Sequence, residues 1–309
     1  MIQLKQEELI KSRGYRATIK AAYNLFTDNY KVILKHIWPY ALAMAVVLGA
    51  FVLNQFRVYG QPPMMLLSML SSLCMIILVF VTDALFTGRI MMFINGQSFP
   101  WNFQRSLKIW LWMLLLLAIV SVFVFTISYL ILPGADDTSA GIPQTDPMIQ
   151  MQQQQMDYFK SMGVVTITMT AFLLLLLPLV YIIMQYFVET NTHFHKIFFK
   201  GWKIGMKHWG YIFITLLVVT ICMTVVTMIL SLPLTILFTA YGISLQGVAM
   251  GDEAGLPGYF IPLAFVVSLI SYFIYFILTI FPLFAIYYIY GSIEAKEQEK
   301  RNLKLNTEY

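Results

Sequence analysis

Charged residues are scarce in this chain of 309 residues. Asp, Glu, Lys and Arg together make up 11% of it, whereas ordinary soluble domains contain about 25%. Apolar residues reach 59%, and the mean hydropathy is +0.74. A soluble fold of this size cannot bury so much apolar side chain, so part of its solvent is lipid. The composition excludes a cytosolic enzyme and a disordered regulator.

Cysteine and histidine are also rare, with 2 and 4 residues respectively. Cys74 and Cys222 lie inside apolar stretches, and no CxxC or metal-ligand spacing includes them. This excludes a disulfide-stapled secreted domain. Basic residues do not cluster with aromatic ones as in a nucleic-acid platform, so we expect no nucleic-acid partner.

Long stretches without charge predict an all-α, polytopic membrane helix bundle with six transmembrane helices. About 20 apolar residues cross the ~30 Å of hydrocarbon in a bilayer. Residues 1–309 form one integral membrane domain, with a cytoplasmic amphipathic segment at 1–36 and a basic cytoplasmic tail at 291–309. The spans are expected at about 37–56, 64–82, 109–132, 162–188, 210–231 and 260–290.

The distribution of Lys and Arg gives the orientation of these spans. Alternate loops and termini hold 18 of these residues on one side and 2 on the other. The positive-inside rule then places both termini in the cytoplasm. No cleavable signal peptide is visible in the sequence. The absence of an Asn-x-Ser/Thr sequon favours a bacterial origin, so we expect the chain in the cytoplasmic (inner) membrane of a bacterium.

The region from 210 to 250 allows two interpretations. Pro233 follows Ser231-Leu232 and predicts that the fifth span ends there, which makes 234–250 an interfacial or re-entrant piece. The alternative is a seventh crossing through 234–250. That alternative would move the basic tail to the outside, against the charge distribution.

Three parts of the chain share the same markers. A Lys and then a Trp enter each odd-numbered span, a Pro follows the Trp after 23 or 24 residues, and an acid ends each even-numbered span. These markers are Lys35, Lys108 and Lys207; Trp38, Trp110 and Trp209; Pro62, Pro133 and Pro233; and Asp83, Glu189 and Glu294. The recurrence predicts three repeats of an amphipathic elbow followed by a transmembrane hairpin.

The first elbow has apolar residues at helical spacing, namely Ile19, Tyr23, Phe26, Tyr30 and Ile33. Thr27-Asp28-Asn29 is expected to separate this elbow from the first span. Its counterparts are predicted at 83–94, ended by Asn95-Gly96, and at 189–200, ended by Gly201.

This plan resembles the six-span membrane domain associated with bacterial glycerophosphodiester phosphodiesterases and related stand-alone membrane proteins of unknown function. The similarity covers nearly the whole chain and rests on the Lys-x-Trp signatures and their spacing. It implies three elbow-and-hairpin units with inner termini. The family's catalytic barrel has no counterpart here, so none of its catalytic residues can be assigned to positions in this sequence.

The repeat markers also predict a ring of charges at the cytoplasmic rim, the inner collar. Asp83, Glu189 and Glu294 would lie at one depth with Lys35, Lys108 and Lys207, while Trp38, Trp110 and Trp209 anchor the interface. Pairs at a hydrated rim contribute ~0–1 kcal/mol each, so single neutralisations should change stability little. The alternative is that the acids point into a functional cavity.

No catalytic or metal site emerges from the remaining polar residues. Glu189, His193 and His195 do not match the spacing of an HExxH zinc site, and a hydrated elbow accounts for them. The predicted spans contain no ionisable group, although ion-coupled carriers and proton pumps need one near the midplane. We expect no enzyme activity, cofactor or metal.

The function predicted from the sequence is therefore that of a non-catalytic integral membrane protein that organises lipid or supports other membrane proteins. Membrane lipids are the expected partners, with other membrane proteins as further candidates. The alternative is a transporter or permease subunit for an apolar or neutral solute. A cavity lined by Gln185 with Thr and Ser residues would favour that alternative.

Overall fold

The computed structural model describes residue 4 and residues 6–59, 65–131, 147–190, 192–251 and 255–307. The structure is 89% helical, and its described residues contain no β-strand. Six helices are long and apolar enough to cross a membrane, which confirms the predicted all-α membrane bundle. The helices are α1 (Tyr15–Asp28), α2 (Tyr30–Tyr59), α3 (Met65–Asn95), α4 (Phe99–Ile131), α6 (Pro147–Leu176), α7 (Leu179–Val188), α8 (Phe194–Lys207), α9 (Trp209–Ala249) and α10 (Phe260–Thr307).

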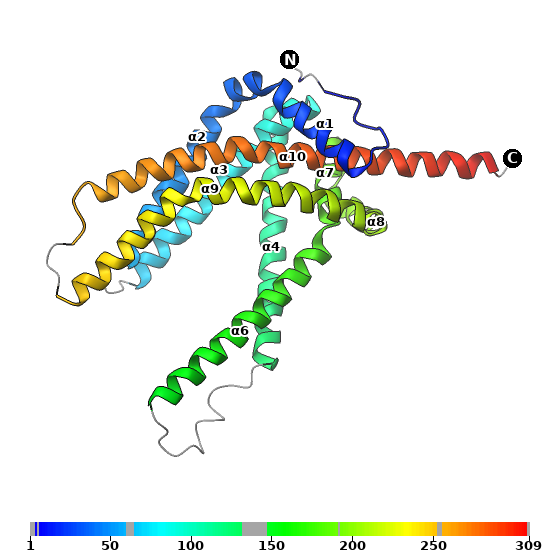
Figure 1. Cartoon of the computed structure of the whole chain (residues 1–309). Coiled ribbons are helices and arrows are strands. Elements are labelled where there is room, and N and C mark those ends of the chain that lie inside the picture. The colour runs from blue at the N-terminus through cyan, green and yellow to red at the C-terminus, as the bar shows by residue number, and fades with distance from the viewer. Residues whose placement is uncertain are drawn as a thin grey trace.

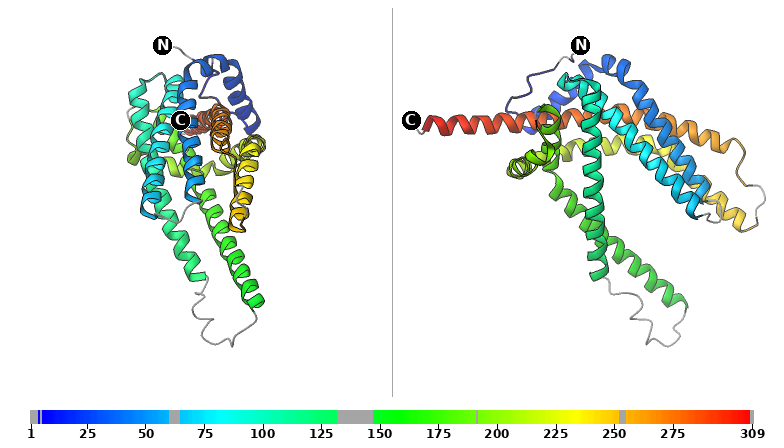
Figure 2. Two further views of the ribbon diagram at one scale, coloured as in Figure 1. Left: turned by 90° about the vertical axis from the view of Figure 1, so that its left-hand side faces the viewer. Right: turned by 180° about the vertical axis from the view of Figure 1, so that it is seen from behind.

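Helix α10 is the central element of the bundle (Figure 1). It packs against α1, α2, α7 and α9, while α3 packs against both α2 and α4. The hairpin of α4 and α6 diverges from the other long helices, as the views from behind and from the side also show (Figure 2). The apolar window of α6 has none of its residues buried, so this hairpin presents most of its surface to lipid.

The core lies around the middle of α10. Ile280, Phe284 and Tyr288 follow one another at four-residue steps and are fully buried, so they form one face of the helix. Pro282 lies inside α10 without ending it. Beyond Ala295 the sequence becomes charged, and this part of α10 projects from the bundle (Figure 1).

The predicted break between the first elbow and the first span is confirmed. Helix α1 ends at Asp28, and α2 begins at Tyr30. The Asn29 side-chain amide donates to the Leu25 carbonyl at 2.9 Å, which satisfies a free acceptor at the end of α1. The hydroxyls of Thr18 and Tyr211 lie 2.6 Å apart and join α1 to α9.

The second elbow is not a separate helix, which corrects the prediction for 83–94. Helix α3 runs without interruption from Met65 to Asn95, because no Pro or strong breaker lies between Asp83 and Ile94. It does end at the predicted position, where Gly96 adopts a positive φ of 69°. Gly88 brings α3 close to α4, because a Cβ there would lie 3.0 Å from the Phe103 backbone.

The span predicted at 162–188 consists of two helices. Helix α6 ends at Leu176 and α7 begins at Leu179, because Pro178 lacks an N–H and its ring clashes with the preceding turn. Helix α8 does not end at the predicted Gly201 but continues to Lys207. A Cβ at Gly205 would lie 2.8 Å from Pro178, so this glycine allows α8 to approach the break closely.

Helix α9 continues through Pro233 to Ala249, so the predicted end at Ser231 and the re-entrant piece at 234–250 are wrong. Membrane helices tolerate proline inside them, and Pro233 removes one backbone donor without ending α9. The other two repeat prolines, Pro62 and Pro133, lie outside the described residues.

Residues 6–13, which we call the N-terminal strap, lie along α10. Arg13 is 5% exposed, and its guanidinium lies 5.0 Å from the centroid of the Tyr288 ring. It donates to the carbonyls of Glu8 at 2.5 Å and Leu9 at 3.1 Å. The Leu9 carbonyl in turn lies directly against Gly291 of α10. The strap is therefore held by a buried cation and by a glycine that leaves room for its backbone.

Candidate functional site

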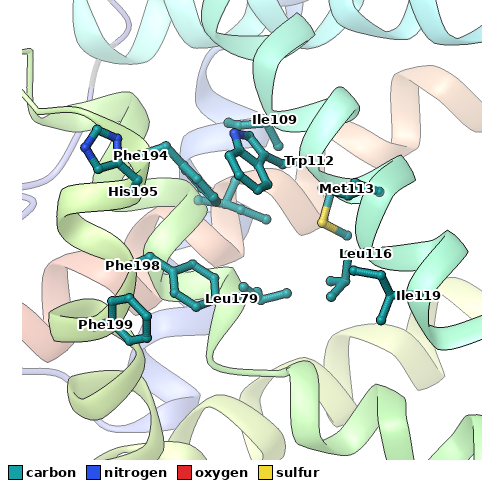
Figure 3. A pocket seen from close by; sticks show the side chains of 12 residues that line it. Ile109, Trp112, Met113, Leu116, Ile119, Leu179, Phe194, His195, Phe198 and Phe199 are labelled. Atoms are coloured by element: carbon teal, nitrogen blue, oxygen red, sulfur yellow. The ribbon is translucent and has the colours of Figure 1, made fainter. Parts of the chain in front are cut away.

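An apolar pocket of about 300 Å³ lies between α4, α7 and α8. Figure 3 shows its side chains pointing towards one another from the helices that form it. Ligand pockets in proteins typically measure roughly 300–1,000 Å³. The lining residues are Ile109, Trp112, Met113, Leu115, Leu116 and Ile119 of α4, Leu179 and Ile183 of α7, and Phe194, His195, Phe198 and Phe199 of α8.

The local sequence explains why a pocket forms here. Near the C-terminal end of α8, Gly201 and Gly205 allow close contact with Ile182 and Pro178. The first turns of α8 instead carry large aromatic side chains, and Phe194 stacks on Trp112 of α4 with the ring centroids 5.7 Å apart. The apolar pocket lies beside this contact.

The pocket opens on the outer surface of the bundle. Trp112 is 48% exposed, and Leu115 and Ile119 are more than half exposed. All three belong to α4, whose apolar surface faces lipid in a membrane-spanning bundle. The mouth of the pocket therefore lies on the lipid-facing side of α4.

A second, polar pocket of about 530 Å³ adjoins the apolar one. Trp112, Phe194 and His195 line both. The remaining lining residues of the polar pocket are Trp101, Gln104, Arg105, Lys108, Tyr186, Thr190, Thr192 and His193. Its two charged side chains are both basic, and no acidic side chain is among the described residues that line it.

Arg105 is fixed in this pocket by the end of α7. Its guanidinium donates to the carbonyls of Glu189 at 2.8 Å and Thr190 at 2.6 Å, and also to that of Tyr186. The Trp101 and Tyr186 rings lie 3.9 and 4.3 Å from it. Arg105 therefore caps free carbonyls of α7 and offsets the negative end of that helix dipole.

Two acids of the predicted inner collar meet where α7 crosses α10. Glu189 accepts hydrogen bonds from the Gln185 amide at 2.8 Å and the Tyr290 hydroxyl at 3.4 Å. Tyr181 donates to Glu294, and the rings of Tyr181 and Tyr290 lie 5.4 Å apart. Tyrosine hydroxyls and an amide, rather than lysines, thus satisfy both carboxylates.

The predicted pairing of collar acids with collar lysines is not found among the described ion pairs. Glu294 instead pairs with Arg301 at 3.5 Å. Asp83 accepts hydrogen bonds from the side chains of Trp110 and Thr87. Lys108 lines the polar pocket, and Lys35 lies on α2 beside Trp38. The common depth of the six collar charges stays a prediction.

The third collar lysine takes part in a small ion network at the base of the α10 projection. Glu297 lies 2.8 Å from both Lys207 and His208, and 3.8 Å from Lys300. The network joins the end of α8 and the start of α9 to α10. It was not expected from the sequence, because the repeat markers point to Glu294 rather than Glu297.

We expect Glu297→Gln to lower the free energy of unfolding by roughly 1 kcal/mol, because several partly exposed cations share one carboxylate. The effect should shrink at high salt, where such pairs are screened. Thermal unfolding in detergent at two salt concentrations measures both. Glu299→Gln is the control, because Glu299 is exposed on the same helix. Equal unfolding of the two variants would contradict this role.

The three tryptophans predicted to anchor the interface lie in different surroundings. The Trp209 indole N–H donates to the Leu174 carbonyl at 2.8 Å, Trp38 is 47% exposed, and Trp110 packs on Phe80. Their roles as interface anchors and the threefold repeat stay predictions.

The Glu-His-His set of the third elbow does not converge on a common point. The rings of His193 and His195 lie 6.0 Å apart, while the Glu189 carboxylate turns towards α10. Within the described part of the chain, no group of three His, Cys, Asp or Glu residues is placed to hold a metal ion.

Sequence reasoning missed the two adjoining pockets. Their walls combine α4 with α7 and α8, whose lining residues follow those of α4 by about 60 or more positions, so no local sequence pattern predicts the pockets. The available signal was Lys108 one helical turn before Trp112, next to a predicted membrane interface. No family model, curated protein or solved structure matches this chain. The fold and the pockets together define a membrane-embedded helical protein.

Proposed function

We propose that this chain is a non-catalytic integral membrane protein that organises lipid in a bacterial inner membrane, with both termini in the cytoplasm. One observation carries the proposal: an apolar pocket open to the bilayer adjoins a polar pocket whose charged residues are basic. A membrane lipid has the same two parts, an acyl chain and a phosphate-bearing headgroup. The distribution of 18 basic residues against 2 supports placing both pockets at the cytoplasmic leaflet.

The position of Gln185 favours this function over transport of a neutral solute. A solute cavity was expected to include Gln185, yet this side chain is 8% exposed and donates to Glu189. It lies between α7 and α8, where a Cβ at Gly201 would come within 3.2 Å of its Oε1 atom. Gln185 therefore belongs to the packing of the helices.

Filling the mouth of the apolar pocket tests the proposal. Leu115→Trp places a larger ring at a side chain that lines the pocket, so lipid retained by protein purified in mild detergent should fall several-fold. Lipid extracted per mole of protein gives the measurement. Leu117→Trp is a matched control, because Leu115 and Leu117 are each 53% exposed on α4 and Leu117 does not line the pocket. Equal retention by both variants would refute the proposal.

A further inference from the structure

We infer that the two pockets together bind one glycerophospholipid of net negative charge, with its phosphate beside Lys108 and an acyl chain in the apolar pocket. This inference rests on the proposed function and specifies its ligand. It follows from the charges of the polar pocket, from the position of Lys108 one helical turn from Trp112, which lines both pockets, and from the orientation of the helix ends that meet there.

The charges of the polar pocket select against a zwitterionic headgroup. Arg105 and Lys108 are its charged side chains, and the described lining residues include no carboxylate. The amine of a zwitterionic lipid would lie among like charges without an acidic partner, whereas a phosphate meets only favourable charge. A headgroup with a phosphate and no amine is therefore the best match.

Lys108 is the side chain placed to contact the phosphate. The donors of Arg105 are engaged with the carbonyls at the end of α7, so this residue contributes charge more than contacts. Lys108 is exposed and takes part in no ion pair among the described residues. It precedes Trp112 by four residues, so both lie on the same face of α4. Trp112 lines both pockets, so Lys108 lies in the polar pocket one helical turn from the wall that the two pockets share.

The first turn of α8 adds a second favourable feature. His193 precedes α8 and makes no side-chain capping bond to it, and the first backbone N–H groups of a helix lack partners within the helix itself. The positive end of the helix dipole lies here, whereas Arg105 offsets the negative end of α7. His193 and His195 line the same pocket and provide further donors.

The apolar pocket suits a flexible chain because its walls are made almost entirely of apolar side chains. Phe194 and Phe198 face Met113 and Leu116 across it (Figure 3). Since its mouth is open along α4, a chain can occupy the pocket while the rest of the lipid stays in the leaflet. Headgroup and chain then bind at adjoining positions of one site.

Titration with two lipids that share the same acyl chains tests this inference. Delipidated full-length protein in a non-ionic detergent is titrated with phosphatidylglycerol or phosphatidylcholine, and bound lipid is counted by native mass spectrometry. We expect phosphatidylglycerol to bind about tenfold more tightly to the wild-type chain, which corresponds to roughly 1.4 kcal/mol. Lys108→Gln should remove most of this preference, and Leu115→Trp should weaken binding of both lipids.

Lys200→Gln is the matched control for charge, because Lys200 is exposed on α8 and lines neither pocket. It should keep the preference for phosphatidylglycerol. We expect Lys108→Gln to unfold at the same temperature as the wild-type chain, because Lys108 is exposed. This measurement shows that the variant is folded.

The titration separates failure of the inference about the lipid from failure of the proposed function. If both lipids bind equally and Leu115→Trp weakens both, the inference about charge is wrong and the proposed function stands. If the preference survives Lys108→Gln, the assignment of the phosphate to this site is wrong. If neither lipid binds, or if the pocket is covered by a second copy of the chain in a dimer that Leu115→Trp dissociates, both the inference and the proposed function fail.

Discussion

Replacement of Arg105 by alanine should cost the protein at least ~2 kcal/mol of stability, because each buried carbonyl left without a donor costs about 1–3 kcal/mol. The Arg105 side chain bonds to several carbonyls at the end of α7 and lies between the rings of Trp101 and Tyr186. The end of α7 and the segment that leads into α8 should loosen together.

Arg105→Lys should recover only part of the loss, because an ammonium group cannot reproduce the planar fork of a guanidinium. Thermal unfolding in detergent and hydrogen exchange over residues 186–190 measure the effect. Arg16→Ala serves as the control, since Arg16 is exposed and its described contact is with the neighbouring Tyr15 ring. An Arg105→Ala variant as stable as Arg16→Ala would show that α7 does not depend on this cap.

Gly291→Ala should displace the N-terminal strap from α10. A Cβ at this position would overlap the Leu9 carbonyl oxygen and lie 2.5 Å from a Leu9 side-chain carbon. Overpacking of this kind typically costs about 1–3 kcal/mol. The strap can avoid this clash by moving away from α10. That movement would expose Arg13 and break its hydrogen bonds to the Glu8 and Leu9 carbonyls.

Tryptic cleavage after Arg13 reports this displacement, because Arg13 is only 5% exposed while the strap is in place. Cleavage should become fast in Gly291→Ala. Gly242→Ala is the control, since a Cβ there meets nothing within 4 Å and alanine is the better helix former by about 1 kcal/mol. Should Gly291→Ala resist trypsin as the control does, the strap does not need the glycine contact.

Proline shows how far local sequence predicts this fold. The sequence predicts a stop at Pro233, yet α9 continues through it, whereas α6 and α7 are separated at Pro178. Both prolines lack the same N–H, so the difference lies in their surroundings. Pro178 packs against Gly205 of another helix, which stabilises a change of direction. Pro233 is exposed on α9, and the helix continues through it.

The inner collar also shows how far local sequence predicts contacts in this protein. The sequence marks Glu189 and Glu294 as acids that follow apolar stretches, but their partners in the structure are Gln185, Tyr290 and Tyr181. Partner choice depends on how α7 crosses α10. That crossing follows from the packing of side chains on two helices more than 70 residues apart, which a spacing pattern along one chain does not encode.

Composition and periodicity by themselves determined that this protein is an all-α membrane bundle with six long apolar helices, because a backbone in hydrocarbon must satisfy its hydrogen bonds internally. They also determined the break between α1 and α2 at Asn29. Only the tertiary structure decided that Lys108 and Trp112 of α4 meet the aromatic start of α8 at two adjoining pockets. The reason is physical: helix formation is local, whereas a pocket depends on how closely three separate helices can pack.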